Sequence, residues 1–161
     1  MSLENARKYL AEFGRDSDII EFPVSSATVE LAAKAANVIP ARITKTLSFK
    51  IDNRCILICA AGDAKIDNKK YKEFFGVKAK MLTPEEVLEF TTHAIGGVCP
   101  FGVPENVATY TDISLKRFST VFPACGSSNS AIELTCAELF ALSKAKEWID
   151  VCKGWQETEE I

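Results

Sequence analysis

Two adjacent glycines and a proline mark the segment of this chain best suited to hold a ligand through its main chain, Gly96-Gly97-Val98-Cys99-Pro100-Phe101-Gly102. Glycine has no Cβ, so the backbone can turn sharply there and bring N–H groups close to a bound oxygen. Pro100 fixes its own φ and restricts Cys99 before it, which makes the loop stiff. A stiff loop of main-chain donors suits a carbonyl or phosphate oxygen, although the same composition is typical of an ordinary turn.

Lys45 lies in a segment, Ile43 to Ile51, whose apolar and polar residues alternate. This pattern predicts a half-buried strand. A lysine on such a strand can supply a fixed positive charge to a phosphate or an oxyanion, or it can simply face solvent. A second group of small residues, Gly126-Ser127-Ser128-Asn129, can line a small binding site or form a plain Ser/Asn turn.

The chain has six cysteines and one histidine, which limit its metal and thiol chemistry. No Cys-x-x-Cys pair occurs and no ligand spacing surrounds His93, so we expect no metal site. Without a secretion signal, an even cysteine count is weak support for disulfides, and buried free thiols are expected. Cys99 is a candidate nucleophile, but a catalytic thiol needs a base, and His93 has no evident carboxylate to orient it.

Length and composition predict one ordinary domain, which we assign to residues 1–155, followed by an acidic tail at 156–161 that frays. No apolar run can span a bilayer and the first residues lack the layout of a secretion signal, so we expect a cytoplasmic protein without a membrane partner. The net charge of −3 argues against nonspecific coating of DNA. Residues 63–80 nevertheless carry six lysines against three acids, which predicts either a basic surface or a solvated helix face.

Hydrophobic spacing and turn residues predict the elements that position these groups. Helices are expected near 3–13, from a cap at Ser25 or Ser26 through Ala36, from Asp67 or Asn68 to Gly76, from a Thr83 cap to about Phe90, and at 137–144 after a Thr135 cap. Strands are expected near 19–22, 43–51, 55–60, 77–82, 107–110, 120–123 and 131–134, with a hairpin turn at Asp52-Asn53. Helices and strands intermix without strict alternation, which favours a single mixed α+β domain.

Four motifs occur in order along nearly the whole chain: Lys45-Thr46-Leu47, Gly62-Asp63-Ala64-Lys65 with the lysine-rich segment after it, the loop from Gly96 to Gly102, and Gly126 through Ala131-Ile132-Glu133-Leu134. In this combination the chain resembles the bacterial aminoacyl-tRNA deacylases of the YbaK/EbsC type, relatives of the editing domain inserted in bacterial prolyl-tRNA synthetase. The resemblance implies a compact α/β domain with helices around a largely antiparallel, barrel-like sheet. It also implies hydrolysis of the ester that joins a wrong amino acid to the 3′ ribose of a tRNA.

The resemblance also implies roles for individual residues. Lys45 matches the lysine that holds the terminal adenosine phosphate or the ester region, and Gly96 and Pro100 match the ends of a GxxxP loop. N–H groups near Gly97 and Val98 are candidate oxyanion donors, which completes the expected catalytic set. An aminoacyl ester is already activated, so a positioned water and a stabilised oxyanion suffice, and no cofactor is expected. The expected substrate contacts are Phe22, Thr46, Cys99, Phe101, Gly126, Ser127, Ser128 and Asn129.

The sequence departs from the cysteine-specific deacylases at two places. Those proteins have a basic, glycine-containing turn and an aspartate near the position of Ala131, and Phe22 stands where they have an aromatic hydroxyl. The expected substrate is therefore tRNA(Pro) carrying alanine, cysteine or another small residue. A pocket sized for proline rejects smaller residues by only about 1–3 kcal/mol, so a second hydrolytic sieve is useful. Prolyl-tRNA synthetase is an expected partner, and the alternative is a non-catalytic module of the same fold that binds tRNA or synthetase.

Overall fold

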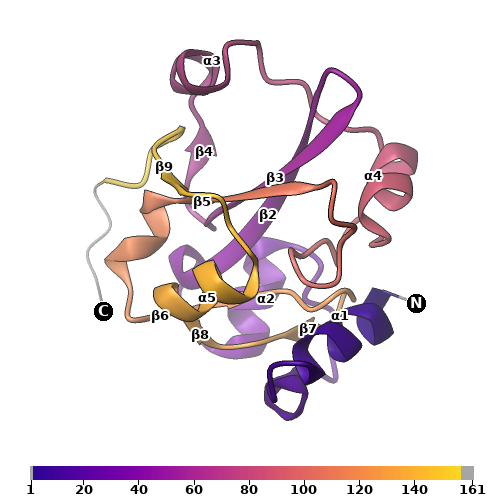
Figure 1. The fold of residues 1–161 in the computed structure, drawn as a ribbon. Helices are drawn as coiled ribbons and strands as arrows, with labels where there is room; N and C mark the ends of the chain where they lie inside the picture. Colours follow the sequence, from indigo (N-terminus) through magenta and orange to yellow (C-terminus); the bar gives the residue numbers. More distant parts are fainter. Residues whose placement is uncertain (1, 157–161) are drawn as a thin grey trace.

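The hairpin predicted around Asp52-Asn53 forms the centre of the computed structural model, which describes residues 2–156 (Figure 1). Strand β2 (Ile43–Ile51) and strand β3 (Arg54–Ala61) pair in antiparallel register along their length. Asp52 turns the chain at a φ of +56°, a conformation that aspartate tolerates because its short side chain can bond locally. The alternation of the sequence is thus realised as the predicted strand.

Six strands of the described chain form one curled sheet in the order β8-β6-β2-β3-β5-β9. The strands beside the hairpin are β5 (Ala108–Asp112), β6 (Thr120–Pro123), β8 (Leu134–Thr135) and β9 (Trp148–Ile149). The β2–β3 and β6–β8 pairs are antiparallel, whereas β2–β6, β3–β5 and β5–β9 are parallel. Each parallel pair joins strands without a tight turn between them, so nothing local imposes the opposite direction. The predicted mixed α+β domain with a barrel-like sheet is confirmed, but the sheet is mixed rather than largely antiparallel, because three of its five strand pairings are parallel.

Helices and two short ladders surround this sheet (Figure 1). Over residues 2–156 the α-helices are α1 (Ser2–Ala11), α2 (Val29–Ala36), α3 (Asn68–Phe75), α4 (Pro84–Thr91) and α5 (Cys136–Leu142), and the 3₁₀ turns are η1 (Asp16–Asp18), η2 (Pro40–Arg42) and η3 (Ile113–Arg117). The ladders pair β1 (Ile20–Glu21) with β7 (Ser130–Ala131), and β4 (Lys65–Ile66) with β10 (Cys152–Lys153). None of the described helices has the length and apolar character needed to cross a membrane.

Most helix boundaries follow the predicted capping residues. Asp67 caps α3 by accepting main-chain N–H groups, and Gly76 ends it at a φ of +79°. Thr83 and Thr135 each begin a helix with a capping box, in which the hydroxyl and a glutamate three residues later satisfy free main-chain donors. These four boundaries are confirmed.

Three local predictions are wrong. The strand expected at 131–134 is instead two short strands, β7 and β8, which pair with different partners. Thr28, rather than Ser25 or Ser26, caps α2 by accepting the Leu31 N–H at 3.2 Å. The strand expected at 77–82 is reduced to a single bridge between Met81 and β2. That segment meets only the far end of the β2 edge before α4 begins, so its alternation finds no ladder to join.

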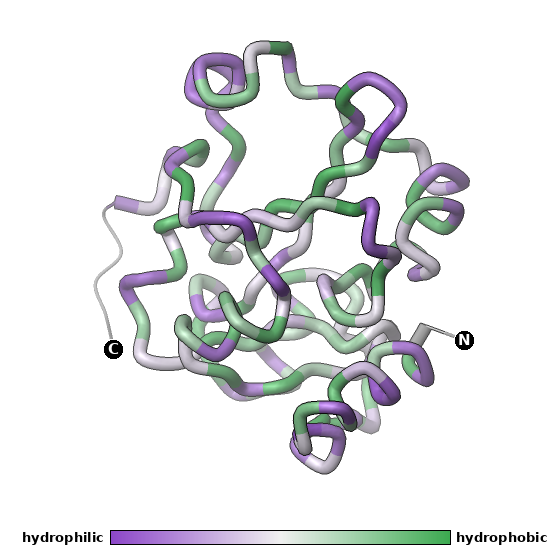
Figure 2. Tube along the Cα trace, in the orientation of Figure 1, coloured by the Kyte–Doolittle hydropathy of each residue, from purple (hydrophilic) through white to green (hydrophobic). Residues whose placement is uncertain are grey.

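The core draws on both ends of the described chain. Ala6 and Leu10 of α1, Tyr71 of α3 and Val151 near β10 are all fully buried in one cluster. Figure 2 shows hydrophobic residues along the central strands and hydrophilic residues at the hairpin tip. All six cysteines are free, and five are buried as predicted. The domain assigned to 1–155 stays a prediction, and the predicted tail lies outside the described residues apart from Gln156.

We predict that Glu86→Gln lowers the melting temperature at pH 7, and that this loss shrinks as the pH falls. The capping hydrogen bond from the Thr83 N–H, followed by the ion pair with Lys50 at 2.9 Å, lowers the pKa of Glu86 to about 2. A carboxyl whose pKa is lower in the folded state stabilises fully above its unfolded pKa of about 4.3 and loses this contribution as the pH falls towards 2. Thermal melts between pH 3 and 7 measure it. Glu85→Gln is the control, and a loss independent of pH would contradict the prediction.

Candidate functional site

A pocket of about 260 Å³ opens beside β2, and several predicted site residues line it. Lys45 and Thr46 contribute from the strand, and Gly96 and Val98 contribute from the glycine loop. The other walls come from the start of α2, from the chain leading into α4, and from the region of β6 and β7. The fold thus brings together two motifs that lie far apart in the sequence.

The pocket exists because β2 pairs with its second neighbouring strand, β6, over only part of its length. Strand β3 covers one edge of β2 throughout, whereas β6 pairs with the other edge only at Ile43 and Thr44. Main-chain hydrogen bonds at Ser48 and Lys50 close that edge again, where the chain before α4 crosses it. Peptide groups of alternate residues face the same edge of a strand. The peptide groups of Thr46 therefore face the unpaired length of the β2 edge, between β6 and the chain before α4.

The side chain of Lys45 is half-buried at this unpaired edge, and its amine makes no ion pair or hydrogen bond within residues 2–156. Burial lowers the pKa of its amine, because removal from water disfavours the ammonium form. The nearby charge of Lys65 acts in the same direction, while the carboxylates of Asp63 and Glu30 oppose it. An anion in the pocket would counter this shift and would find an amine with no competing partner among the described residues.

The glycine loop and the Ser/Asn turn touch through their backbones at Gly97. A Cβ on Gly97 would lie 2.7 Å from the carbonyl carbon of Gly126 and 2.7 Å from the nitrogen of Ser127. Side-chain carbons do not approach main-chain atoms so closely, so only glycine permits this contact. Gly126 itself turns at a φ of +90°. The two predicted motifs therefore form one backbone unit at the edge of the pocket.

Only part of the loop offers free main-chain donors. The Gly97 N–H donates to the carbonyl of Ala94 at 3.0 Å. This corrects the expectation that Gly97 donates to an oxyanion, because its N–H is already engaged. Gly96 and Val98 line the pocket, and the structure gives their N–H groups no acceptor within residues 2–156.

The other half of the loop faces the core. Cys99 and Phe101 are fully buried, and Pro100 lines a separate hollow beside Tyr9. Nε2 of His93 lies 2.8 Å from the carbonyl oxygen of Phe101 and 3.5 Å from Sγ of Cys99, which supports the loop from behind. A fully buried side chain cannot touch a substrate, so the contacts expected of Cys99 and Phe101 are wrong. Burial also raises the pKa of the Cys99 thiol, which disfavours a nucleophilic thiolate.

The Ser/Asn turn is tied to the chain that leads into α2. The Ser26 N–H donates to the carbonyl of Ser128 at 2.6 Å, and the Phe22 N–H donates to the carbonyl of Asn129 at 2.7 Å. Nδ2 of Asn129 donates back to the carbonyl of Phe22 at 3.1 Å. These bonds hold the first residues of the α2 wall against the turn.

The turn residues support the pocket from behind its wall. The hydroxyl of Ser127 donates to Oγ of Ser130 at 2.6 Å. Ser130 and Ala131 line the pocket, whereas none of 126–129, nor the buried Phe22, is among the described lining residues. The substrate contacts expected from these five positions are therefore not formed by the pocket walls.

Several walls carry no signal in the sequence. Met81 and Ile95 are 61% and 62% exposed at the pocket, but isolated apolar residues on a surface are common and suggest no site. One wall could have been predicted from the sequence through the helix cap at Thr28. Residues 26–29 line the pocket there, at the start of α2. First-turn N–H groups of a helix favour an anion or an oxyanion.

The site therefore combines one unpartnered amine, two free loop N–H groups, an open strand edge and largely apolar walls. Such a set can hold an ester carbonyl beside a phosphate and accept a small side chain. Within residues 2–156, no group of three or more His, Cys, Asp or Glu side chains could hold a metal ion.

A family model described as the aminoacyl-tRNA editing domain matches residues 24–142, a range that includes α2, the central hairpin and both glycine turns. This chain belongs to the aminoacyl-tRNA editing domain family. The resemblance to YbaK-type deacylases predicted from the sequence is confirmed.

This chain matches some relatives over their whole length and others over only a part. The uncharacterised protein YwhH of Bacillus subtilis (strain 168) is 58% identical over 157 residues, which cover 97% of this chain and 100% of YwhH. Proline–tRNA ligase of Geobacillus sp. (strain WCH70) is 31% identical over 102 residues, 63% of this chain but only 18% of the ligase. A solved structure described as a candidate trans-editing enzyme for prolyl-tRNA synthetase superposes with a TM-score of 0.86 at 30% identity, covering 95% of this chain and 98% of the other.

We predict that Gly97→Ala destabilises the editing domain by about 1–3 kcal/mol, the usual range for overpacking a rigid site. The added methyl would lie within 2.8 Å of three consecutive main-chain atoms of Gly126 and Ser127. Were Gly97 an ordinary turn glycine, alanine would stabilise by about 0.4–1 kcal/mol through the unfolded state. Urea unfolding separates the two by the sign of the change, and a gain in stability would contradict the backbone contact.

Proposed function

We propose that this editing domain is a trans-acting hydrolase that removes a wrong amino acid from the 3′ end of a tRNA. One observation carries the proposal. In a member of this family, Lys45, the open β2 edge and the loop residues Gly96 and Val98 lie at one pocket. The proline–tRNA ligases among its relatives support tRNA(Pro) as the substrate and prolyl-tRNA synthetase as a partner. We expect it to act with the translation machinery of the cytoplasm.

The proposed mechanism needs no covalent intermediate. Water attacks the carbonyl carbon of the aminoacyl ester while the N–H groups of Gly96 and Val98 donate to the oxygen that becomes negative. The bond to the ribose 3′ oxygen then breaks, that oxygen takes the proton given up by the attacking water, and the free amino acid and the tRNA leave. Lys45 supplies a fixed positive charge beside the ester or the terminal phosphate. One donor of this kind typically contributes 10²–10³ in rate.

The packed walls of the pocket support a small amino acid as the one removed. They include Ala32, Phe122 and Ala131, which are all buried. These packed walls leave little room for a large side chain, because displacing them would disturb the core behind. We therefore propose alanine, cysteine or a residue of similar size.

A panel of tRNA(Pro) charged separately with Ala, Cys, Ser and Pro tests the proposed function. At micromolar protein, we expect hydrolysis of at least one of the first three. Release of none of them, with tRNA binding retained, would instead favour a non-catalytic binding module. Loss of both hydrolysis and binding would remove tRNA from the proposal altogether.

We predict that Lys45→Met lowers kcat/KM for the hydrolysed substrate by about 10²–10³, the range found when one oxyanion donor is lost. The melting temperature should not fall, because Lys45 has no described partner and its amine is held out of water. Lys34→Met, at an exposed position on α2, is the matched control and should retain activity. A Lys45→Met protein within threefold of wild type would exclude Lys45 from the chemistry.

We also predict that Cys99→Ala keeps hydrolysis within a few-fold of wild type. Cys99 is fully buried behind the loop and burial raises the pKa of its thiol, so it cannot serve as a nucleophile. The same charged-tRNA assay measures this, with circular dichroism to confirm folding. Abolished activity in a folded Cys99→Ala protein would support thiol catalysis instead.

A further inference from the structure

Two lysines face each other on the ladder formed by β4 and β10. Lys153 lies directly opposite Lys65, and both side chains are exposed. Like charges placed directly opposite weaken a strand pair. Within residues 2–156 neither lysine makes an ion pair or a side-chain hydrogen bond. A bound anion would turn this repulsion into attraction.

The described carboxylates nearest in the chain are already engaged elsewhere. Asp63, two residues before Lys65, binds an arginine of η3 at 2.6 Å. Asp150 binds Lys70 at 3.0 Å. Asp67 accepts two N–H groups at the start of α3. The charge of Asp67 also acts on Lys153, but in the described part of the chain none of these acids forms an ion pair with either lysine of the pair.

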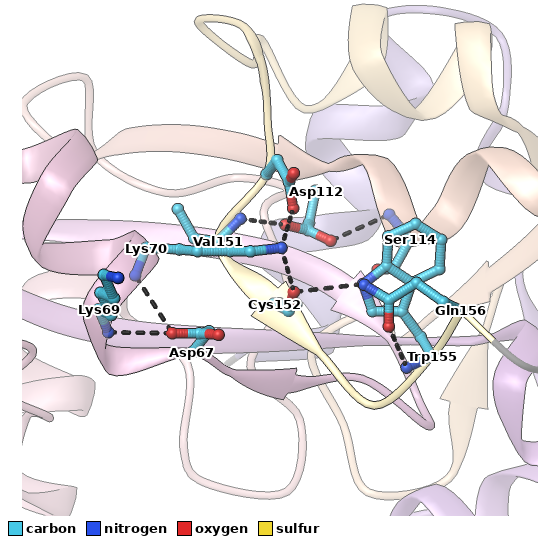
Figure 3. A network of polar contacts seen from close by, with 10 residues as sticks. Asp67, Lys69, Lys70, Asp112, Ser114, Val151, Cys152, Trp155 and Gln156 are labelled. Carbon is cyan, nitrogen blue, oxygen red and sulfur yellow. Dashed lines mark hydrogen bonds and ion pairs between the residues drawn. The ribbon is translucent and has the colours of Figure 1, made fainter.

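Hydrogen bonds hold the chain just before β10, and Figure 3 shows the one between Val151 and Asp112. The buried carboxylate of Asp112 accepts the Val151 N–H at 3.0 Å. The carbonyl of Val151 in turn accepts the Asp67 N–H at 2.8 Å. These bonds fix the end of the ladder where Val151 meets Asp67, and the pair of Lys65 and Lys153 follows two positions further along.

The pair lies close to the pocket. Lys45 stands opposite Ala60 on the central hairpin, and Lys65 follows five residues after that partner. Lys65 is near enough for its charge to contribute to the lowered pKa of Lys45. Lys69 is exposed at the start of α3, where its N–H donates to Asp67 (Figure 3).

We propose that Lys65 and Lys153 bind phosphates of the RNA strand whose aminoacyl end occupies the pocket, with Lys69 extending this phosphate track. The proposal rests on the proposed function, because backbone phosphates are the anions covalently attached to that substrate. Lys45 lies at the reacting end, and the phosphates before the terminal nucleotide pass over the lysine pair. The track gives part of the lysine-rich segment 63–80 a role that the pocket alone does not explain.

The test measures kcat/KM for the hydrolysed aminoacyl-tRNA as a function of salt, in wild type, Lys65→Gln, Lys153→Gln and the double variant. Each loss of a phosphate contact should raise KM several-fold, leave kcat unchanged, and reduce the slope of log kcat/KM against log salt by about 0.7, the value for single strands. A 3′-aminoacyl adenosine, which has no preceding phosphates, should be hydrolysed equally by all four proteins. Thermal stability should stay level or rise, because the variants remove a like-charge pair.

Lys8→Gln, an exposed position on α1, is the matched control and should keep the wild-type salt slope. Unchanged slopes in the lysine-pair variants, or equal losses on tRNA and on aminoacyl adenosine, would overturn the proposal. Should wild type hydrolyse no charged tRNA, the proposed function fails, and the same variants are compared for binding of uncharged tRNA across salt. Identical binding by all of them would then overturn the phosphate track as well.

Discussion

The early departure of β6 from β2 is the constraint on which the site depends. A strand flanked on both edges has no free peptide groups, so a fully paired β2 would offer a ligand only its two faces. Because β6 leaves after Thr44 and the chain before α4 arrives only at Ser48, a short length of edge stays open in the middle of the sheet. The start of α2 and the glycine loop line the pocket beside this open edge.

One side of the glycine loop lines the pocket, and the other side packs into the protein. Gly96 and Val98 face the pocket, whereas Gly97, Cys99 and Phe101 are buried. The buried side packs on another backbone at Gly97 and bonds to His93, and these contacts fix the direction in which the exposed N–H groups point. Rigid donors need no reorganisation when charge develops on a substrate, which is where this kind of catalysis gains its rate. The buried residues of the loop thereby hold Gly96 and Val98 in position to act on a substrate.

Some of the described basic side chains of the domain form ion pairs with carboxylates, and others form none. Arg15, Arg117 and Lys70 pair with carboxylates and tie elements together. Lys45 and the pair Lys65–Lys153 have no such partner among the described residues. A desolvated amine and an opposed pair of like charges both oppose stability. Their presence near one pocket is consistent with binding to a polyanion.

The sequence alone determined the local elements and the family. The alternation from Ile43 to Ile51 specified β2, the caps at Asp67, Thr83 and Thr135 specified three helix starts, and four ordered motifs pointed to the editing domain. Local rules suffice there because side-chain spacing and capping act within a few residues. The tertiary structure decided which half of the glycine loop faces the pocket, where β2 stays unpaired, and which lysines face one another. Those outcomes depend on contacts between segments far apart in the chain, and no local pattern records them.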